Sequence, residues 1–436
     1  MLNQENNSGT SAPNQDRWLR LGLLGCGLLL IVAVAFSVGS GVGFAIGRMN
    51  NGNNAAVQTG PDGSAGDFVE GDRGLSSQDL DVFWEAMGLL ERDFYGDLPT
   101  PQDRSYGAIR GVLDMLDDPN TSFMTPDQAT SFLESMDGSF EGIGATVDWE
   151  EEMGAVRIVE PFENQPAWEA GLRRNDLVIA IDGEDVSDMV DLNEAVSKIK
   201  GPRGTTVVLT IVRADVDDPF DVEVERDVIQ IPIVFSETLG ENQDVAYVRL
   251  SRFSDNAGDR LRDAIKNALS ERDVRGMVFD LRGNPGGLLR EAVHVSSLFL
   301  PEDELVLIER FSDGSEDLYR AEGGAIVPED LPIVVLVDEG SASASEIVAG
   351  ALQDNQRAKL VGTVTYGKGS VQLPHTLQGG SIMRVTVARW YTPNDRTIDG
   401  EGLQPDLLVA LDEAAPSDSD LQLDAALELL HATVAE

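Results

Sequence analysis

Alternation between apolar strands and amphipathic helices constrains the second half of this 436-residue chain more than any other feature. From residue 229 onward, short runs rich in Val, Ile and Leu, such as PIVVLVDEG, alternate with stretches of helical periodicity, such as ASEIVAGALQD. This alternation predicts an α/β core over residues 229–436, with a largely parallel sheet, helices packed against it and an amphipathic C-terminal helix docked on the body. Functional sites in such sheets lie in the loops that follow the carboxyl ends of strands.

The first loop of interest lies in residues 337–350, VDEGSASASEIVAG, and carries Ser341, Ser343 and Ser345. One interpretation makes these serines the cap and first turn of a helix that begins near Ser343, with Glu346 favoured by the helix dipole. A second interpretation makes one serine a nucleophile, because N–H groups at a helix start face an oxyanion that forms on the substrate. Spacing alone leaves both interpretations open.

A serine nucleophile needs a base, and the chain offers few. Of the three histidines, His294 and His431 lie in helical stretches, whereas His375 lies in a loop near the serines and stays an alternative base. Lysine is scarce, and Lys368 stands between glycines in TYGKGSVQLPH. Burial can lower the pKa of such an amine until it accepts a proton. The uncharged carbonyl of Gln372 offers a group that would orient the amine without restoring its charge.

A second loop, FDLRGNPGGLLREAV in residues 279–293, also joins a strand to a helix. It can be a plain turn. A phosphate-binding loop is a poorer match, because the Gly-Lys-Ser/Thr ending is missing. The backbone N–H groups of Gly286 and Gly287 suit the second donor of an oxyanion hole.

Residues 138–228 have a different character, with short β-branched runs separated by Gly, Asn and Asp. The stretch 163–186, ENQPAWEAGLRRNDLVIAIDGEDV, resembles the PDZ pattern of a helix, a turn with Asp, a strand and an Asp-Gly turn. Upstream, Gly142, Ile143 and Gly144 in GIGATV predict a loop whose backbone N–H groups bind a peptide carboxylate. The alternative is a tight turn without a ligand.

The N-terminal part contains an uncharged segment, residues 21–47, long enough to cross a ~30 Å hydrocarbon core as a helix. Arg17 and Arg20 precede it, which places residues 1–20 in the cytoplasm and everything after the segment outside. Ala33–Ala35 offer a signal-peptidase site, so cleavage is the alternative to an uncleaved anchor. Cys26 is the sole cysteine, so the exported part has no disulfide and no Cys-based zinc site.

Composition fills in the remaining segments. Residues 48–74 are rich in Gly, Asn and Asp and predict a flexible linker, and residues 75–137 predict a helical segment. The net charge is −44, which argues against nucleic acid as a partner and is typical of a solvated acidic surface.

The motifs DLRGNPGG, GSASASEI and GKGSVQ, in that order behind a PDZ-like segment, closely resemble the C-terminal processing peptidases, also called tail-specific proteases. YGAIRGVLDMLDDPNTSFMTP and YTPNDRTIDGEGLQPD look like segments of the same family, so the resemblance covers roughly residues 75–409. It implies Ser343 as nucleophile, Lys368 as base and Gln372 as the partner of the lysine. It also implies oxyanion amides from Ala344 and from the Gly286–Gly287 turn.

The resemblance further implies a crotonase-like core, a PDZ domain that captures apolar C-terminal tails, and often an oligomer held by terminal helices. Neither a metal nor a cofactor is needed for this chemistry. The sequence therefore predicts a single-pass, membrane-anchored serine endopeptidase whose catalytic part is extracytoplasmic. The alternative is a non-catalytic PDZ scaffold with a protease-like core.

Overall fold

The computed structural model describes Ser76 and residues 78–151, 153–240, 243–270, 273–410 and 419–435. The predicted membrane helix at 21–47 and the predicted linker at 48–74 lie outside these residues. Among the residues that are described, no helix is both long and apolar enough to cross a membrane.

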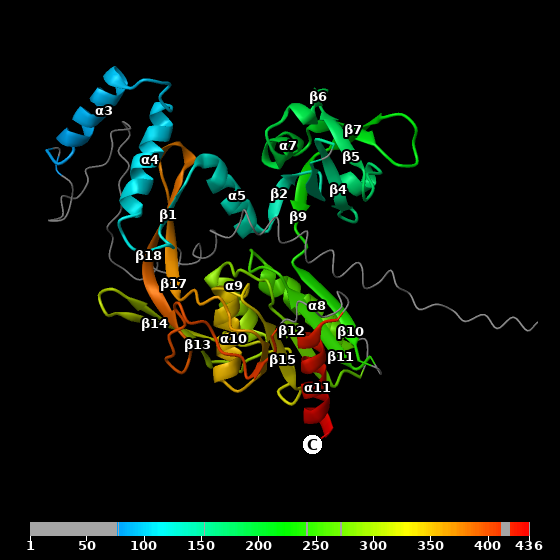
Figure 1. Ribbon diagram of the computed structural model, residues 1–436. Helices are drawn as coiled ribbons and strands as arrows, with labels where there is room; N and C mark the ends of the chain where they lie inside the picture. The colour runs from blue at the N-terminus through cyan, green and yellow to red at the C-terminus, as the bar shows by residue number, and fades with distance from the viewer. Residues whose placement is uncertain are drawn as a thin grey trace, which may run out of the picture.

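A six-stranded sheet forms the centre of the core (Figure 1). One edge pair is antiparallel and all the other pairs are parallel, as the alternation predicts. In spatial order the strands are β10 (Val234–Leu239), β11 (Val245–Leu250), β12 (Gly276–Asp280), β15 (Ile333–Val337), β16 (Lys359–Gly362) and β19 (Leu407–Leu408).

Helices cover both faces of this sheet, which explains why β15 is apolar at every position. Val335 and Val337 join the cluster formed with helices α8 (Ala257–Ser270), α9 (Leu289–Ser297) and α10 (Ala344–Asp354). Val334 and Leu336 point the other way and pack with Ala426 and Leu430 of α11 (Leu421–Ala435). Successive side chains of a strand face opposite sides, so a strand buried on both faces has no polar position.

The core also contains a second sheet, which is antiparallel. The run LVLIERF belongs to the alternating part of the chain that predicts a largely parallel sheet, but as β13 (Leu305–Phe311) it pairs antiparallel with β14 (Glu316–Arg320) and β18 (Ile382–Tyr391). The physical reason is the short connection 312–315, which permits a hairpin but no parallel crossover. The strands β1 (Ser122–Met124) and β17 (Ser370–Thr376) complete the sheet on β18.

A separate domain sits over the core and has its own apolar centre (Figure 1). The two-stranded pair β2 (Ser139–Gly142) and β9 (Asp227–Gln230) brings the chain entering and leaving this domain side by side. The limits 138–228 stay a prediction. The elements of the domain are β3 (Ala145–Glu150), β4 (Ala155–Pro161), α6 (Pro166–Glu169), β5 (Leu177–Ile181), β6 (Glu184–Asp185), a 3-10 turn (Val186–Asp188), α7 (Leu192–Ile199), β7 (Thr206–Val212) and β8 (Phe220–Glu225).

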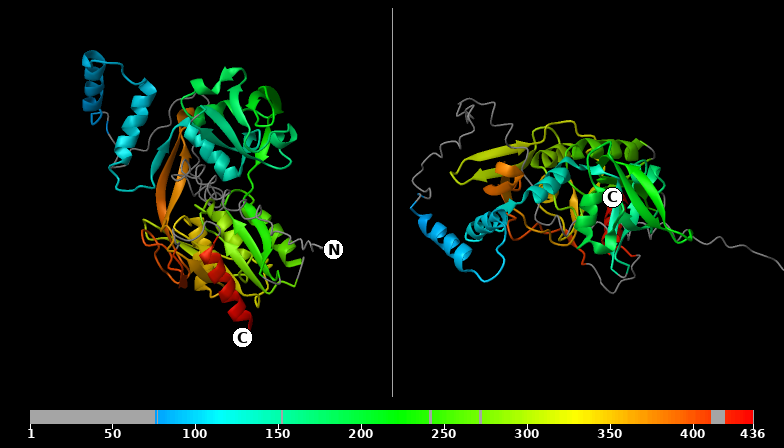
Figure 2. Two further views of the ribbon diagram at one scale, coloured as in Figure 1. Left: turned by 45° about the vertical axis from the view of Figure 1, so that its right-hand side comes forward. Right: turned by 90° about the horizontal axis from the view of Figure 1, so that it is seen from above.

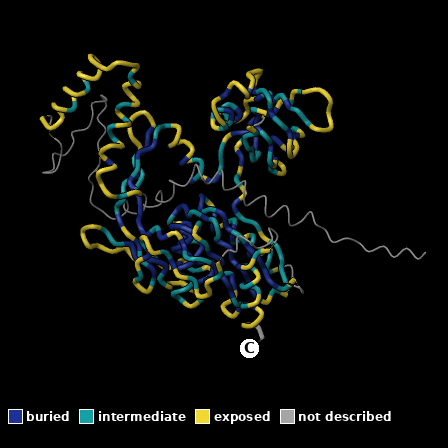
Figure 3. Tube along the Cα trace, viewed as in Figure 1, coloured by how far each residue is buried: buried dark blue, intermediate teal, exposed yellow. Residues whose placement is uncertain are grey.

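The predicted N-terminal helices are present as α3 (Asp81–Asp93), α4 (Pro101–Leu113) and α5 (Pro126–Asp137). Helix α5 begins with Thr125 as its cap and ends at Gly138, whose φ of 68° suits glycine at a helix end. Phe132 and Met136 of α5 are buried with Leu288 of the core. By contrast, α3 has no buried residue and projects from the body (Figures 2 and 3).

Docking of α11 on the core sheet yields a stability prediction. Leu430 is 2% exposed, and we expect Leu430→Ala to lower the free energy of unfolding of the core by about 3 kcal/mol, because the sheet cannot collapse into the space left. The exposed Glu428→Ala on the same helix is the control and should stay within about 0.5 kcal/mol of wild type. Urea denaturation followed by circular dichroism measures both, and equal stabilities would contradict the docking.

Candidate functional site

The site is built from the loops that follow β12, β15 and β16. After β15 the chain turns at Ser343, a residue 2% exposed with φ 55° and ψ −112°, a sparsely populated backbone conformation for a residue other than glycine. Its neighbours hold the turn: Ser341 Oγ donates to the Leu281 carbonyl at 2.9 Å, and Ser345 Oγ donates to the Asn284 carbonyl at 2.8 Å. The hydroxyls of Ser341 and Ser345 therefore have a structural role, which distinguishes these two serines from the predicted nucleophile, Ser343.

The glycine turn after β12 lies against the Ser343 turn. A Cβ on Gly286 would lie 2.6 Å from the Ala342 carbonyl oxygen and 3.0 Å from Ser343 Cβ, so only glycine permits this approach. Gly286 N–H donates to Asn284 Oδ1 at 2.9 Å. Within the described chain, no hydrogen bond uses the N–H of Gly287 or of Ala344. The oxyanion roles stay predictions, and this hydrogen bonding favours Gly287 over Gly286 as the partner of Ala344.

Lys368 lies in a tight loop between β16 and β17. A Cβ on Gly367 would lie 2.8 Å from Gly402 N, and one on Gly369 would lie 2.8 Å from Asp399 Cβ, so both glycines are needed for the close packing. Burial is the main cause that lowers the pKa of Lys368, to about 7, and the positive charge of Arg384 lowers it further. A lysine with this pKa is partly neutral at neutral pH and able to accept a proton.

Glu346 joins the serine turn to the lysine loop. Its buried carboxylate accepts hydrogen bonds from Ser343 N at 2.7 Å and from Lys368 N at 2.9 Å, both on Oε2. Burial raises the pKa of Glu346, and its hydrogen bonds oppose that rise. Sequence reasoning treated this residue only as a favourable charge in the first turn of a helix.

Gln372 is fully buried on β17, and Arg384 on β18 donates to its Oε1 at 3.1 Å. Gln372 Nε2 donates to Ser370 Oγ at 2.8 Å. That the Gln372 carbonyl orients the Lys368 amine stays a prediction. Sequence reasoning missed Arg384, although a signal exists: Ile382, Arg384 and Trp390 occupy the same inward face of an alternating strand, where an arginine is unusual.

The loop position predicted for His375 is wrong: this alternative base lies exposed on strand β17, beyond Gln372.

In the second domain, the carbonyl groups of the predicted carboxylate loop accept hydrogen bonds: Ala167 N donates to the Ile143 oxygen at 2.7 Å, and Phe162 N donates to the Gly144 oxygen at 2.9 Å. Gly144 has φ 77°, and a Cβ there would lie 2.8 Å from Gln165 Cβ. Peptide binding by Gly142, Ile143 and Gly144 stays a prediction.

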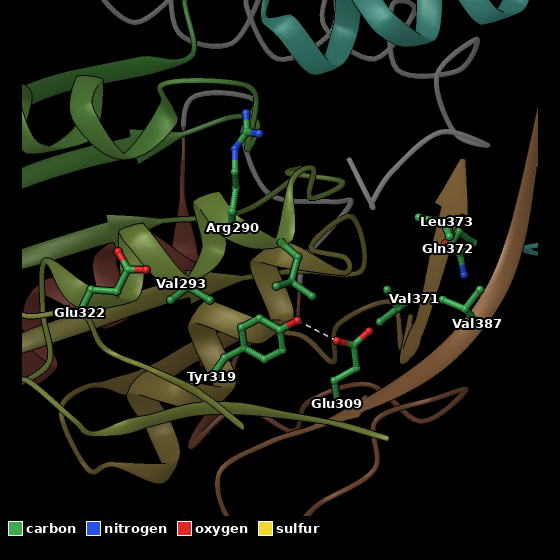
Figure 4. A pocket seen from close by; sticks show the side chains of 10 residues that line it. Arg290, Val293, Glu309, Tyr319, Glu322, Val371, Gln372, Leu373 and Val387 are labelled. Atoms are coloured by element: carbon green, nitrogen blue, oxygen red, sulfur yellow. Dashed lines mark hydrogen bonds between the residues drawn. The ribbon is translucent and has the colours of Figure 1, made fainter. Parts of the chain in front are cut away.

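A mostly apolar pocket adjoins Gln372 (Figure 4). At one side of it, Tyr319 donates a 2.8 Å hydrogen bond to the buried Glu309. Burial and the charge of Glu309 raise the pKa of Tyr319, which keeps its hydroxyl protonated. The apolar walls are formed by Leu289, Val293, Val371, Leu373 and Val387.

No group of three His, Cys, Asp or Glu side chains suited to a metal occurs among the described residues.

Comparison with known proteins agrees with this geometry. Residues 244–409 match the model of peptidase family S41, and residues 157–213 match a PDZ domain. The carboxy-terminal processing protease CtpA of Bacillus subtilis is 36% identical over 350 residues, which is 80% of this chain and 73% of the relative. The chain belongs to peptidase family S41. It is thus a serine peptidase with a mixed α/β fold and a PDZ domain, and the predicted family resemblance is confirmed.

Two further matches concern other members of this family. A carboxy-terminal-processing protease of Bartonella bacilliformis is 39% identical over 321 residues, 73% of this chain and 72% of the relative. The solved photosystem II D1 C-terminal processing protease is 30% identical, with a TM-score of 0.45 and coverage of 79% of this chain and 90% of that one. The assignment to S41 rests on the sequence matches.

The charges around Lys368 give a pH prediction. Wild-type kcat/KM should fall as the pH drops below about 7, because the ammonium form of Lys368 cannot accept a proton. Arg384→Met removes a positive charge that disfavours this ammonium, so the pKa of Lys368 should rise. The acid limb, which is the part of the pH profile where kcat/KM falls with falling pH, should then move to higher pH. Arg320→Met, which removes an exposed arginine of β14, should leave the limb in place. An unmoved limb in Arg384→Met would refute the electrostatic role.

Proposed function

We propose that this S41 peptidase cleaves exported proteins near their C-termini with Ser343 as nucleophile and Lys368 as general base. The observation that carries the proposal is that Ser343 N and Lys368 N bind the same carboxylate oxygen of Glu346, which fixes the two loops against each other. The pKa of Lys368, lowered to about 7 chiefly by burial, supplies the neutral amine that a base requires.

The reaction then has two stages. Ser343 Oγ attacks the peptide carbonyl carbon while its proton passes to Lys368 Nζ, and the lysine returns that proton to the leaving amine as the C–N bond breaks. A water molecule then attacks the acyl carbon while Lys368 takes its proton, and the lysine returns that proton to Ser343 Oγ as the ester bond breaks, which releases the acid product and restores the enzyme. In this proposal the N–H groups of Ala344 and Gly287 stabilise the oxyanion of each tetrahedral intermediate.

The PDZ domain supports substrate selection by the tail. Such domains bind an extended peptide by its terminal carboxylate and an apolar side chain, and the loop at Gly142, Ile143 and Gly144 is the proposed binding segment. The relatives are named for carboxy-terminal processing, which agrees with recognition of this kind. The apolar pocket beside Gln372 is suited to a substrate side chain near the cleaved bond.

Membrane anchoring by residues 21–47 is part of the proposal, since this uncharged segment follows Arg17 and Arg20. Such an anchor places the peptidase outside the cytoplasm. Fractionation of cells, with protease accessibility of the intact membranes, tests both the attachment and the side on which the PDZ and core domains lie.

The mechanism is tested by cleavage of a protein with an apolar C-terminal tail. Ser343→Ala should abolish cleavage, and Lys368→Ala should reduce kcat about 10²- to 10⁴-fold. His375→Ala, the matched test of the alternative base, should cleave like wild type. Equal cleavage by all variants would refute the proposed site, and unchanged tail binding with no cleavage even in wild type would favour the non-catalytic scaffold.

Self-association through the N-terminal helices is a further part of the proposal. Helix α3 exposes large apolar side chains, with Trp84 64% exposed, and burial of such a surface against a second copy would be favourable. The other large apolar residues exposed on the helix and at its end are Val82, Leu89, Leu90 and Phe94.

Sedimentation of the exported part tests this association. We expect wild type to form oligomers, and Trp84→Asp to shift it toward monomer because a charge would be buried at the interface. Trp168→Asp is the matched control, since Trp168 is also exposed but lies on α6 of the PDZ domain. A monomeric wild type would rule out the association.

A further inference from the structure

Glu346 takes no part in the proton transfers of the proposed mechanism, yet its carboxylate accepts four hydrogen bonds. Besides Ser343 N and Lys368 N on Oε2, it accepts from Thr365 Oγ1 at 2.6 Å and from Gly367 N at 2.7 Å, both on Oε1. The side chain is fully buried. Two donors on each oxygen satisfy the carboxylate without water.

The hydrogen bonds favour the ionised form of Glu346. Three of the four donors are backbone N–H groups, which cannot accept a proton from a carboxylic acid. The fourth donor, Thr365 Oγ1, accepts from Leu403 N at 2.7 Å and donates to Glu346 Oε1 at 2.6 Å. These four hydrogen bonds stabilise the carboxylate and oppose the rise in the pKa of Glu346 that burial causes.

Helix capping accounts for only one of the four hydrogen bonds of Glu346. The bond from Ser343 N is what a glutamate in the first turn of a helix makes with its own cap residue. The other three donors, Thr365, Gly367 and Lys368, come from the loop after β16. This loop carries the proposed base, Lys368. Glu346 therefore links the Ser343 turn to the Lys368 loop, in addition to capping its own helix.

The charge of Glu346 also reaches the lysine amine. The charged groups that act on Lys368 come from three elements: Glu346 on α10, Arg384 on β18 and Asp118 in the loop between α4 and β1. The two carboxylates favour the ammonium form and raise the pKa of Lys368, whereas burial and Arg384 lower it more strongly. Glu346 therefore keeps the proton affinity of the amine from falling further.

We propose that Glu346 is a positioning residue, a buried carboxylate that joins the Ser343 turn to the Lys368 loop and so sets the separation of the proposed nucleophile and base. This inference deepens the proposed function and rests on the roles given there to Ser343 and Lys368. It assigns to one side chain both the geometry and part of the electrostatics of the site.

The test is Glu346→Gln in the full chain, assayed for tail cleavage across pH. The amide keeps the size but loses the charge and turns an N–H₂ group toward N–H donors, so kcat should fall on the order of 100-fold while KM changes little. Loss of the negative charge lowers the pKa of Lys368, so the acid limb of kcat/KM should move to lower pH. This shift is opposite in sign to that expected for Arg384→Met.

Two milder variants keep the test decisive if Glu346→Gln fails to fold. Thr365→Val keeps the shape of the side chain and removes one of the four donors, and it should lower kcat about tenfold with KM unchanged. Glu346→Asp retains the charge but cannot reach all four donors, so kcat should fall while the acid limb stays near its wild-type pH. A double-mutant cycle of Thr365→Val with Glu346→Asp should be non-additive, because both changes act on one network.

Glu291→Gln is the matched control. Glu291 is also a buried glutamate in the first turn of a helix, α9, and its carboxylate accepts from Gly258 N at 2.9 Å. We expect this control to lower the melting temperature without moving the acid limb. If the Glu346 and Thr365 variants behave in the same way, with a lower melting temperature and unchanged kcat and pH profile, Glu346 is only structural and the inference is wrong.

Ser343→Ala, run in the same assay, separates this inference from the proposed function. Retained cleavage in Ser343→Ala defeats both, because no nucleophile would remain for Glu346 to position. Lost cleavage in Ser343→Ala together with wild-type kinetics in Thr365→Val and Glu346→Gln defeats the inference alone.

Discussion

Three buried parallel strands, β12, β15 and β16, end at the same edge of the core sheet, and the segments that follow them carry the proposed nucleophile, base and oxyanion donors. Parallel pairing requires crossover connections: the chain passes through α9 and the β13–β14 hairpin between β12 and β15, and through α10 between β15 and β16. The hydroxyls of Ser341 and Ser345 then bind carbonyls in the loop after β12 and fix the Ser343 turn against the glycines. The strained backbone at Ser343 is held by these contacts and by Glu346.

The electrostatics of the site rest on a balance around one amine. Burial and the neighbouring guanidinium of Arg384 push Lys368 toward its neutral form, and two carboxylates oppose them. The resulting pKa of about 7 is the value at which a group both accepts and returns a proton readily near neutral pH. Arg384 reaches this position from β18 of the antiparallel sheet, so the second sheet contributes to the chemistry of the first.

Much of the fold follows from local patterns. Helices α3, α4 and α5, the PDZ strands and the alternating elements of the core all occur where periodicity and turn residues predict them. Strand β13 looks like any other apolar run in the sequence, and only its short connection to β14 distinguishes a hairpin from a parallel crossover. The motif loops were located correctly, but the contacts of Arg384 and Glu346 join elements far apart in the sequence.

The sequence by itself determined the class of fold, the order of the domains and the family, because strand and helix periods and the spacing of glycine, serine and lysine are local properties. The scarcity of lysine and the glycines around Lys368 also pointed to this residue, and the lysine motif together with the family resemblance pointed to Ser343. The tertiary structure decided which serines are structural, why the pKa of Lys368 is lowered, and that Glu346 is bound by both loops. These depend on burial and on hydrogen bonds between distant segments, which exist only once the strands have paired.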